Sequence, residues 1–142
     1  MKHANDFLED RGFKSHVGVH SIAIIGGIAR CYFDKNDGIE RHKDVDIDIY
    51  FAPILDGLDR SLLARINTQC KPAVIYYEGK RVEISRIALR HPRSNDFIED
   101  VRAHGRAHKS IRWKGDSSKG IRGRLGNPIV FIYPEIRPLE KL

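Results

Sequence analysis

Cysteine is scarce in this chain, with only Cys31 and Cys70 among 142 residues. Two cysteines so far apart in sequence do not form a disulfide framework and do not suggest a zinc ligand set, so we expect a reducing, cytoplasmic setting. Long apolar runs are also missing, and none approaches the roughly 20 residues of a membrane-spanning helix. Residues 1–6 lack the apolar core of a secretory signal. The sequence therefore predicts a soluble protein with no membrane partner.

The length predicts a single domain spanning residues 1–142, because the chain is long enough for one core and short for two. Lys and Arg number 25 against 19 acids, which gives a net charge of +6. The excess lies between Arg102 and Arg124, where we expect a basic, flexible loop at about 114–127. This charge suits a polyanionic partner such as RNA or tRNA, or else a protein partner. A solvated basic face is an equally good interpretation of any one of these residues.

A pair of glycines follows a short β-branched run at 21–25, which predicts a buried strand. Gly26 and Gly27 end that strand, and a short helix at 28–33 follows. Glycine lets the backbone turn sharply, and the first N–H groups of a helix are free to face an anion. Taken alone, a di-glycine is more often just a turn.

Residues 44–51 alternate between acidic and apolar side chains, a period of two that predicts a strand. Asp44, Asp46 and Asp48 then lie on one face, and we call them the acidic row. Like charges in such a row repel one another, so a metal ion or another cation is the readiest compensation. Either adjacent pair could hold the ion, and we favour Asp46 and Asp48. In the alternative, Asp44 is a strand-end acid paired with Arg41 or Lys43.

The rest of the chain completes an α+β (α/β) pattern, a mixed and strongly twisted central sheet flanked by helices. Residues 73–77 and 81–87 predict a hairpin with its turn at 78–80, which places Glu83 in the middle of a strand. The other expected elements are a helix at 4–11 capped by Asn5 or Asp6, an amphipathic helix at 55–66, a helix at 96–113 with Phe97, Val101 and Ile111 inward, and a strand at 129–133.

In this order, Gly26-Gly27, Asp46-Ile47-Asp48 and Glu83 resemble the nucleotidyltransferase superfamily, which includes polymerase beta, CCA-adding enzymes and abortive-infection nucleotidyltransferases. The family pattern is an apolar strand, a Gly-Gly or Gly-Ser pair, a short helix, a strand with Asp-x-Asp, and a later strand with a third carboxylate. The resemblance covers residues 4–90 and implies a minimal nucleotidyltransferase-like domain. The gap between Gly27 and Asp46 is longer than is usual in the family.

The resemblance also implies a chemistry. Asp46, Asp48 and Glu83 would be the catalytic acids and would hold Mg²⁺ or Mn²⁺, the oxygen-liganded ions that bridge phosphates. Gly26 and Gly27 would bind the phosphates of a nucleoside triphosphate, with a positive charge added by Arg30 or Lys43. The reaction would transfer a nucleoside monophosphate to a hydroxyl of RNA, tRNA or protein and release pyrophosphate.

Two other functions fit parts of the sequence. Asp48, Glu78 and Lys80 are similar to the acid, then Glu-x-Lys, of restriction-endonuclease-like nucleases, and the basic charge suits DNA. The turn expected at Gly79 and the unexplained di-glycine weigh against this function. Alternatively, the domain is a non-catalytic binding module, for example an antitoxin or a subunit that depends on a partner, since a fold does not prove activity.

Overall fold

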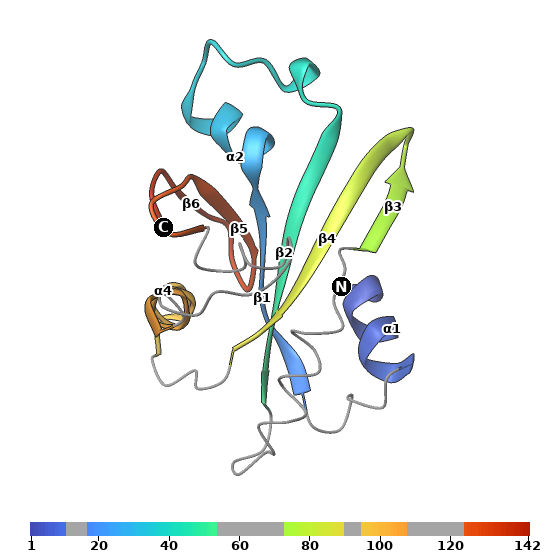
Figure 1. Cartoon of the computed structure of the whole chain (residues 1–142), viewed down its shortest axis with the longest axis vertical. Coiled ribbons are helices and arrows are strands. Elements are labelled where there is room, and N and C mark those ends of the chain that lie inside the picture. The colour runs from blue at the N-terminus through green and yellow to red at the C-terminus, as the bar shows by residue number, and fades with distance from the viewer. Residues whose placement is uncertain (11–16, 54–72, 90–94, 108–123) are drawn as a thin grey trace.

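A computed structural model of the chain describes residues 1–10, 17–53, 73–89, 95–107 and 124–142. They form an α+β fold around a mixed six-stranded sheet with the strand order β3-β4-β2-β1-β5-β6. Figure 1 shows β1, β2 and β4 running through the centre of the molecule and twisting about one another, with helices on either side. The predicted mixed sheet flanked by helices is confirmed.

The strands combine antiparallel and parallel pairs. β1 (Val17–Ile25) pairs antiparallel with β2 (Asp44–Pro53), and β2 pairs parallel with β4 (Lys80–Ala88). The predicted hairpin is confirmed, since β3 (Ala73–Tyr77) pairs antiparallel with β4. The predicted final strand is β5 (Ile129–Tyr133), which lies against the other edge of β1, and β6 (Arg137–Leu139) follows as an edge strand that the sequence did not predict.

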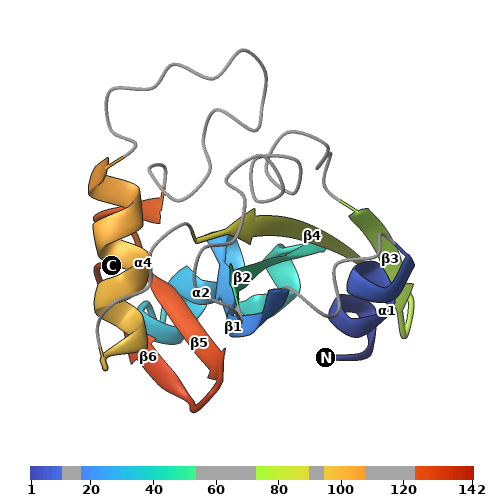
Figure 2. The same cartoon turned by 90° about the horizontal axis from the view of Figure 1, so that it is seen from below.

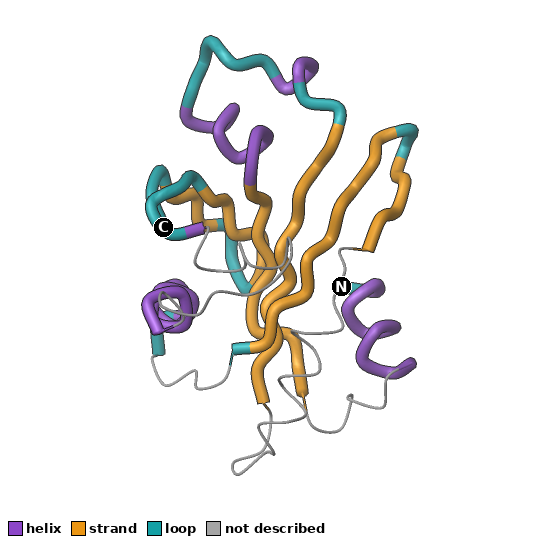
Figure 3. Tube along the Cα trace, in the orientation of Figure 1, coloured by secondary structure: helices purple, strands orange, loops and turns teal. Residues whose placement is uncertain are grey.

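The helices lie at the ends and faces of this sheet, as the colouring in Figure 3 shows. They are α1 (Lys2–Asp10), α2 (Gly26–Phe33), the short 3₁₀ helix η1 (Ile39–Arg41) and α4 (Phe97–Ala107). The capping prediction for α1 is wrong, because this helix begins at Lys2 and Asn5 and Asp6 lie inside it. The predicted helix at 55–66 lies outside the described residues, as does the end of the one predicted at 96–113. No helix within the described ranges is both long and apolar enough to cross a bilayer.

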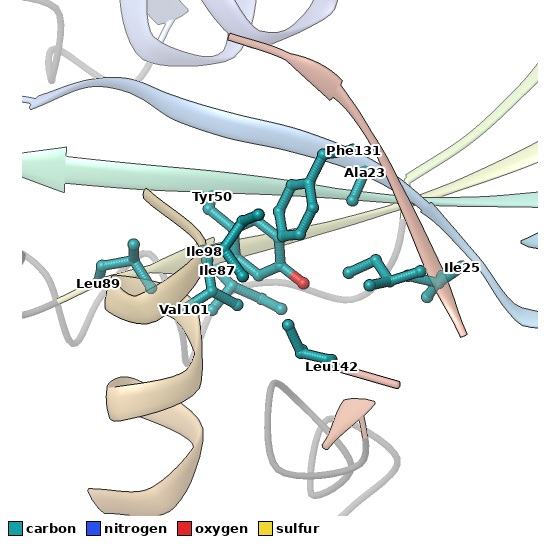
Figure 4. Packing of buried hydrophobic residues seen from close by; sticks show 10 residues of the cluster. Ala23, Ile25, Tyr50, Ile87, Leu89, Ile98, Val101, Phe131 and Leu142 are labelled. Carbon is teal, nitrogen blue, oxygen red and sulfur yellow. The ribbon is translucent and has the colours of Figure 1, made fainter. Parts of the chain in front are cut away.

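Two hydrophobic clusters cover opposite faces of the sheet, because successive side chains of a strand point to opposite sides. On β2, Ile49 and Phe51 pack on the face that meets Ala4 of α1. Tyr50 packs on the other face with Phe131 of β5 and with α4. Figure 2 shows α1 and α4 on opposite sides of the sheet, and Figure 4 shows the second cluster from close by.

A β-bulge at His20 interrupts the alternation of side chains along β1. Val17 and Ile22 belong to the same cluster although five positions separate them, which a regular strand does not permit. The imidazole of His20 reaches Asp100 on α4, with Nε2 3.1 Å from Oδ2, while Nδ1 lies 2.9 Å from the hydroxyl of Ser21. Because Ser21 is fully buried, this trio ties α4 to β1 and does not present a nucleophile.

Candidate functional site

The acidic row lies on the face of β2 that also carries Tyr50. Burial increases steadily along it: Asp44 is exposed, Asp46 is half-buried and Asp48 is completely buried. The pairing of β2 with β4 has a continuous register from Asp44 to Phe51, so no bulge interrupts the alternation. The prediction that three carboxylates share one face is therefore confirmed, and the three differ strongly in their access to solvent.

Asp46 lies where three elements meet. Its register partner on β4 is Glu83, and its partner on β1 is Ile25, the last residue before the di-glycine. Gly26 begins α2 with a φ of +68°, and a Cβ at that position would lie 2.9 Å from Oδ2 of Asp46. The structure thus brings Asp46, Glu83 and Gly26 together as the sequence predicted, and it explains why the residue after β1 is a glycine.

The surroundings of Asp46 disfavour the charged form of its carboxylate. Burial raises its pKa, and the neighbouring charges of Glu83, Asp44 and Asp48 raise it further, although Arg124 acts in the opposite direction. Across the described part of the chain, no hydrogen bond or ion pair reaches this carboxylate. A cation placed between Asp46 and Glu83 would relieve the repulsion between them.

Asp48 has a different environment, because an arginine and a tyrosine satisfy it. Arg124 donates two hydrogen bonds, from Nε to Oδ2 at 2.8 Å and from an Nη to Oδ1 at 3.2 Å, and the hydroxyl of Tyr50 donates a third at 2.7 Å. Burial and the charge of Asp48 raise the pKa of Tyr50 well above its usual value, which keeps that hydroxyl protonated. A metal ion would reach Asp48 only after the guanidinium of Arg124 had moved away.

A second arginine forms ion pairs at the exposed end of the acidic row. Arg81 precedes Glu83 by two positions on β4, and its Nη1 lies 3.0 Å from Oε2 of Glu83 and 3.4 Å from Oδ2 of Asp44. Asp44 therefore pairs with Arg81 and not with Arg41 or Lys43. Guanidinium groups thus bind the two ends of the acidic row and leave Asp46 between them.

The roles of both arginines were not predicted from the sequence. Arg81 had a local signal, because residues i and i+2 of a strand share a face and Glu83 is two positions further on. Arg124 had none, since 76 positions separate it from Asp48. It was assigned only to the general basic segment, of which residues 108–123 lie outside the described chain.

The predicted phosphate-binding residues are only partly assembled. Gly26 and Gly27 form the first turn of α2, and the N-cap residue Ile25 gives that helix no side-chain hydrogen bond, so its side chain satisfies none of the first N–H groups. Arg30 on α2 and Lys43 before β2 are both exposed. Neither makes a hydrogen bond or ion pair with the acidic row among the described residues.

The three residues of the nuclease alternative do not come together. Glu78 lies in the β3–β4 turn with a φ of 47°, and Lys80 is the first residue of β4. Asp48 pairs in register with Ser85, five positions beyond Lys80, a separation of roughly 16 Å along a strand.

None of the protein-family models, curated proteins and solved structures with which the chain was compared matches it.

Proposed function

We propose that this protein is a metal-dependent nucleotidyltransferase that transfers a nucleoside monophosphate from a nucleoside triphosphate to an acceptor hydroxyl, with release of pyrophosphate. One observation carries the proposal. Asp46 and Glu83 are register partners on adjacent parallel strands, and the carboxylate of Asp46 lies against Gly26 at the start of a helix. In this arrangement two acids that would bind the metal lie beside a backbone that would bind the phosphates.

The residues fit a divalent cation with oxygen ligands. Asp46 is half-buried, carries a raised pKa caused by burial and by Glu83, and has no ion-pair partner within the described residues. Asp46 and Glu83 would hold Mg²⁺ or Mn²⁺, with Asp44 beside them. Such an ion, when bound, supplies positive charge to the triphosphate and activates the acceptor hydroxyl.

The backbone at the start of α2 would bind the phosphates. The first N–H groups of a helix have no acceptor within the helix, and the helix dipole favours an anion at this end. Gly26 adopts a φ of +68° and has no side chain, which lets the strand turn into the helix directly beside Asp46. Gly26 and Gly27 at the start of α2 would thus place the phosphates next to the metal ligands.

Asp48 takes a modified role in this proposal. It remains a predicted ligand, but Arg124 and Tyr50 satisfy it in the structure described here. We expect Asp46 and Glu83 to engage the cation first and Asp48 to join once Arg124 withdraws. The acceptor is an RNA, a tRNA or a protein side chain, as the basic charge suggests.

Transfer of label tests the proposal. The full chain is incubated with each α-³²P-labelled nucleoside triphosphate, Mg²⁺ or Mn²⁺, and pooled RNA or lysate protein as acceptor. The wild type should transfer label, and Asp46→Asn and Glu83→Gln should each reduce transfer by at least about 100-fold, since each removes a direct metal ligand. Glu135→Gln is the matched control, because Glu135 is an exposed acid away from the acidic row.

Other outcomes would overturn the proposal in distinct ways. Metal-dependent nicking of DNA without transfer would establish the nuclease. Metal-dependent nucleotide binding, lost in Asp46→Asn but never followed by transfer, would establish a binding module. Equal transfer by wild type and both variants would show that another site carries the chemistry.

A further inference from the structure

A second group of potential metal ligands lies in the connection between α2 and β2. It contains Cys31 near the end of α2, Asp37 in the turn that follows, and His42 just before β2. One ligand atom from each of the three lies within 4.8 Å of the other two. The number and spacing of the cysteines alone do not predict this group.

The three side chains converge on the carboxylate of Asp37. Nε2 of His42 lies 2.9 Å and 3.1 Å from its two oxygens, and the thiol of Cys31 also hydrogen bonds to it. Partial burial and the Asp37 carboxylate raise the pKa of the Cys31 thiol, so without a cation the thiol stays protonated. Once the thiol has ionised and Nε2 of His42 presents its lone pair, a sulfur, a nitrogen and a carboxylate oxygen lie within 4.8 Å of one another and can bind one ion.

The backbone holds this arrangement in place. The N–H of Asp37 donates to the carbonyl of Asp34 at 3.1 Å, and the N–H of His42 donates to the carbonyl of Ile39 at 3.0 Å. Gly27 leaves the space that the imidazole ring of His42 occupies, because a Cβ at position 27 would overlap this ring. His42 and Asp37 each keep only 23% of their side-chain surface exposed. The ligands are therefore positioned before any ion arrives.

The donor set selects the kind of ion. Thiolate and imidazole favour zinc and similar transition metals, whereas Mg²⁺ prefers oxygen alone. Ligands around a tetrahedral zinc ion stand roughly 3–4 Å apart, so the three ligand atoms, which lie within 4.8 Å of one another, need only small shifts to reach that spacing. Three protein ligands leave a fourth position for water or another ligand.

We propose that Cys31, Asp37 and His42 form a transition-metal site, with Zn²⁺ as the preferred ion. It would fix the connection between α2 and β2. It is separate from the proposed Asp46–Glu83 cation site and does not depend on nucleotidyl transfer.

Cobalt provides a direct probe, because a cobalt–thiolate bond gives a charge-transfer band in the near ultraviolet and tetrahedral Co²⁺ absorbs in the visible. The chelator-treated full chain is titrated with Co²⁺ and then with Zn²⁺. We expect one equivalent of Co²⁺ to produce both features and Zn²⁺ to remove them. Cys31→Ser should abolish the thiolate band and weaken binding by at least about 100-fold, because it removes a direct ligand.

Two matched variants control the result. Cys70→Ser removes the other thiol and should leave the cobalt spectrum unchanged. Asp46→Asn removes a ligand of the proposed Mg²⁺ site and should also leave it unchanged, which keeps a failure of this proposal distinct from a failure of the proposed function. Persistence of the thiolate band in Cys31→Ser, or its loss in Cys70→Ser, would overturn the assignment.

Proton release provides a test that needs no variant. Zinc binding to the wild type, measured by calorimetry near pH 7 in buffers of different ionisation enthalpy, should release about one proton, because the thiol must ionise. Binding without proton release would exclude Cys31 as a ligand, and the absence of zinc binding would overturn the proposal.

Discussion

Removal of the guanidinium that binds Asp48 should be one of the most damaging single changes in this chain. Asp48 is completely buried, whereas the side chain of Arg124 retains 22% of its exposure. In Arg124→Met the methionine fills much of the space but leaves a buried carboxylate with only the hydroxyl of Tyr50 as a partner among the described residues.

The cost of an uncompensated buried charge is about 3–5 kcal/mol, and the partial exposure of Arg124 places this pair near the lower limit. A loss of about 3 kcal/mol lowers the folding equilibrium constant by roughly 100-fold. It lowers Tm by roughly 6–12 °C in a domain of this size.

Urea unfolding of the wild type and Arg124→Met at pH 7 measures this loss. The double variant Asp48→Leu/Arg124→Met removes both charges and should recover most of the stability, because an apolar pair tolerates burial. A deficit below about 0.5 kcal/mol for Arg124→Met, or a double variant as unstable as the single one, would refute the reasoning.

Three further changes test other parts of the structure. Gly26→Ala should lower the free energy of unfolding by about 2–4 kcal/mol, because the added Cβ contacts Asp46 in addition to the strain of a positive φ. Gly79 has a φ of 77° and nothing within 4 Å of an added Cβ, so Gly79→Ala should lower it by only about 1–2 kcal/mol, and equal losses in urea unfolding would contradict the contact with Asp46 as the cause. Burial and Glu83 raise the pKa of Asp46 above its unfolded value, so the charged carboxylate opposes folding. In the presence of chelator, Asp46→Asn should therefore be more stable than the wild type at pH 7, and this gain should disappear as the pH falls toward about 4. A gain in stability that grows toward acid pH would disprove the stated direction of the pKa shift. Phe131→Ala should lose about 3–5 kcal/mol of stability, because Phe131 is fully buried with its ring centroid 5.1 Å from that of Phe97. Ile136 is 73% exposed, so Ile136→Ala should change stability by less than about 0.5 kcal/mol. Calorimetric melting of the two variants compares these losses directly.

Much of the fold was predictable because strand periodicity is a local signal. The alternation of residues 44–51 predicted β2 and its two faces, and Gly79 predicted the turn of the hairpin. The extent of β1 was less accessible, because the bulge at His20 breaks the alternation that identifies a strand. The short edge strand β6 contains Pro138, which a sequence pattern treats as a strand breaker.

The candidate site was predictable only as far as it lies within neighbouring strands. Asp46 and Glu83 were expected together, and the structure places them in register. The partner of Asp48 was not expected, because its contact with Arg124 depends on how the last part of the chain returns to the sheet. The group of Cys31, Asp37 and His42 depends on the path of a turn, which residue spacing alone does not determine.

The strand order has a consequence for synthesis on the ribosome. β1 lies between β2, which follows it closely in the chain, and β5, which begins only at Ile129. At about 5–20 residues per second, the ribosome needs roughly 5–20 s to add the residues between the end of β1 and the start of β5. During that interval one edge of the central strand lacks its final neighbour, and an unpaired apolar edge is a template for pairing with other chains. The growing chain therefore exposes this edge of β1 to misassembly until β5 has been made.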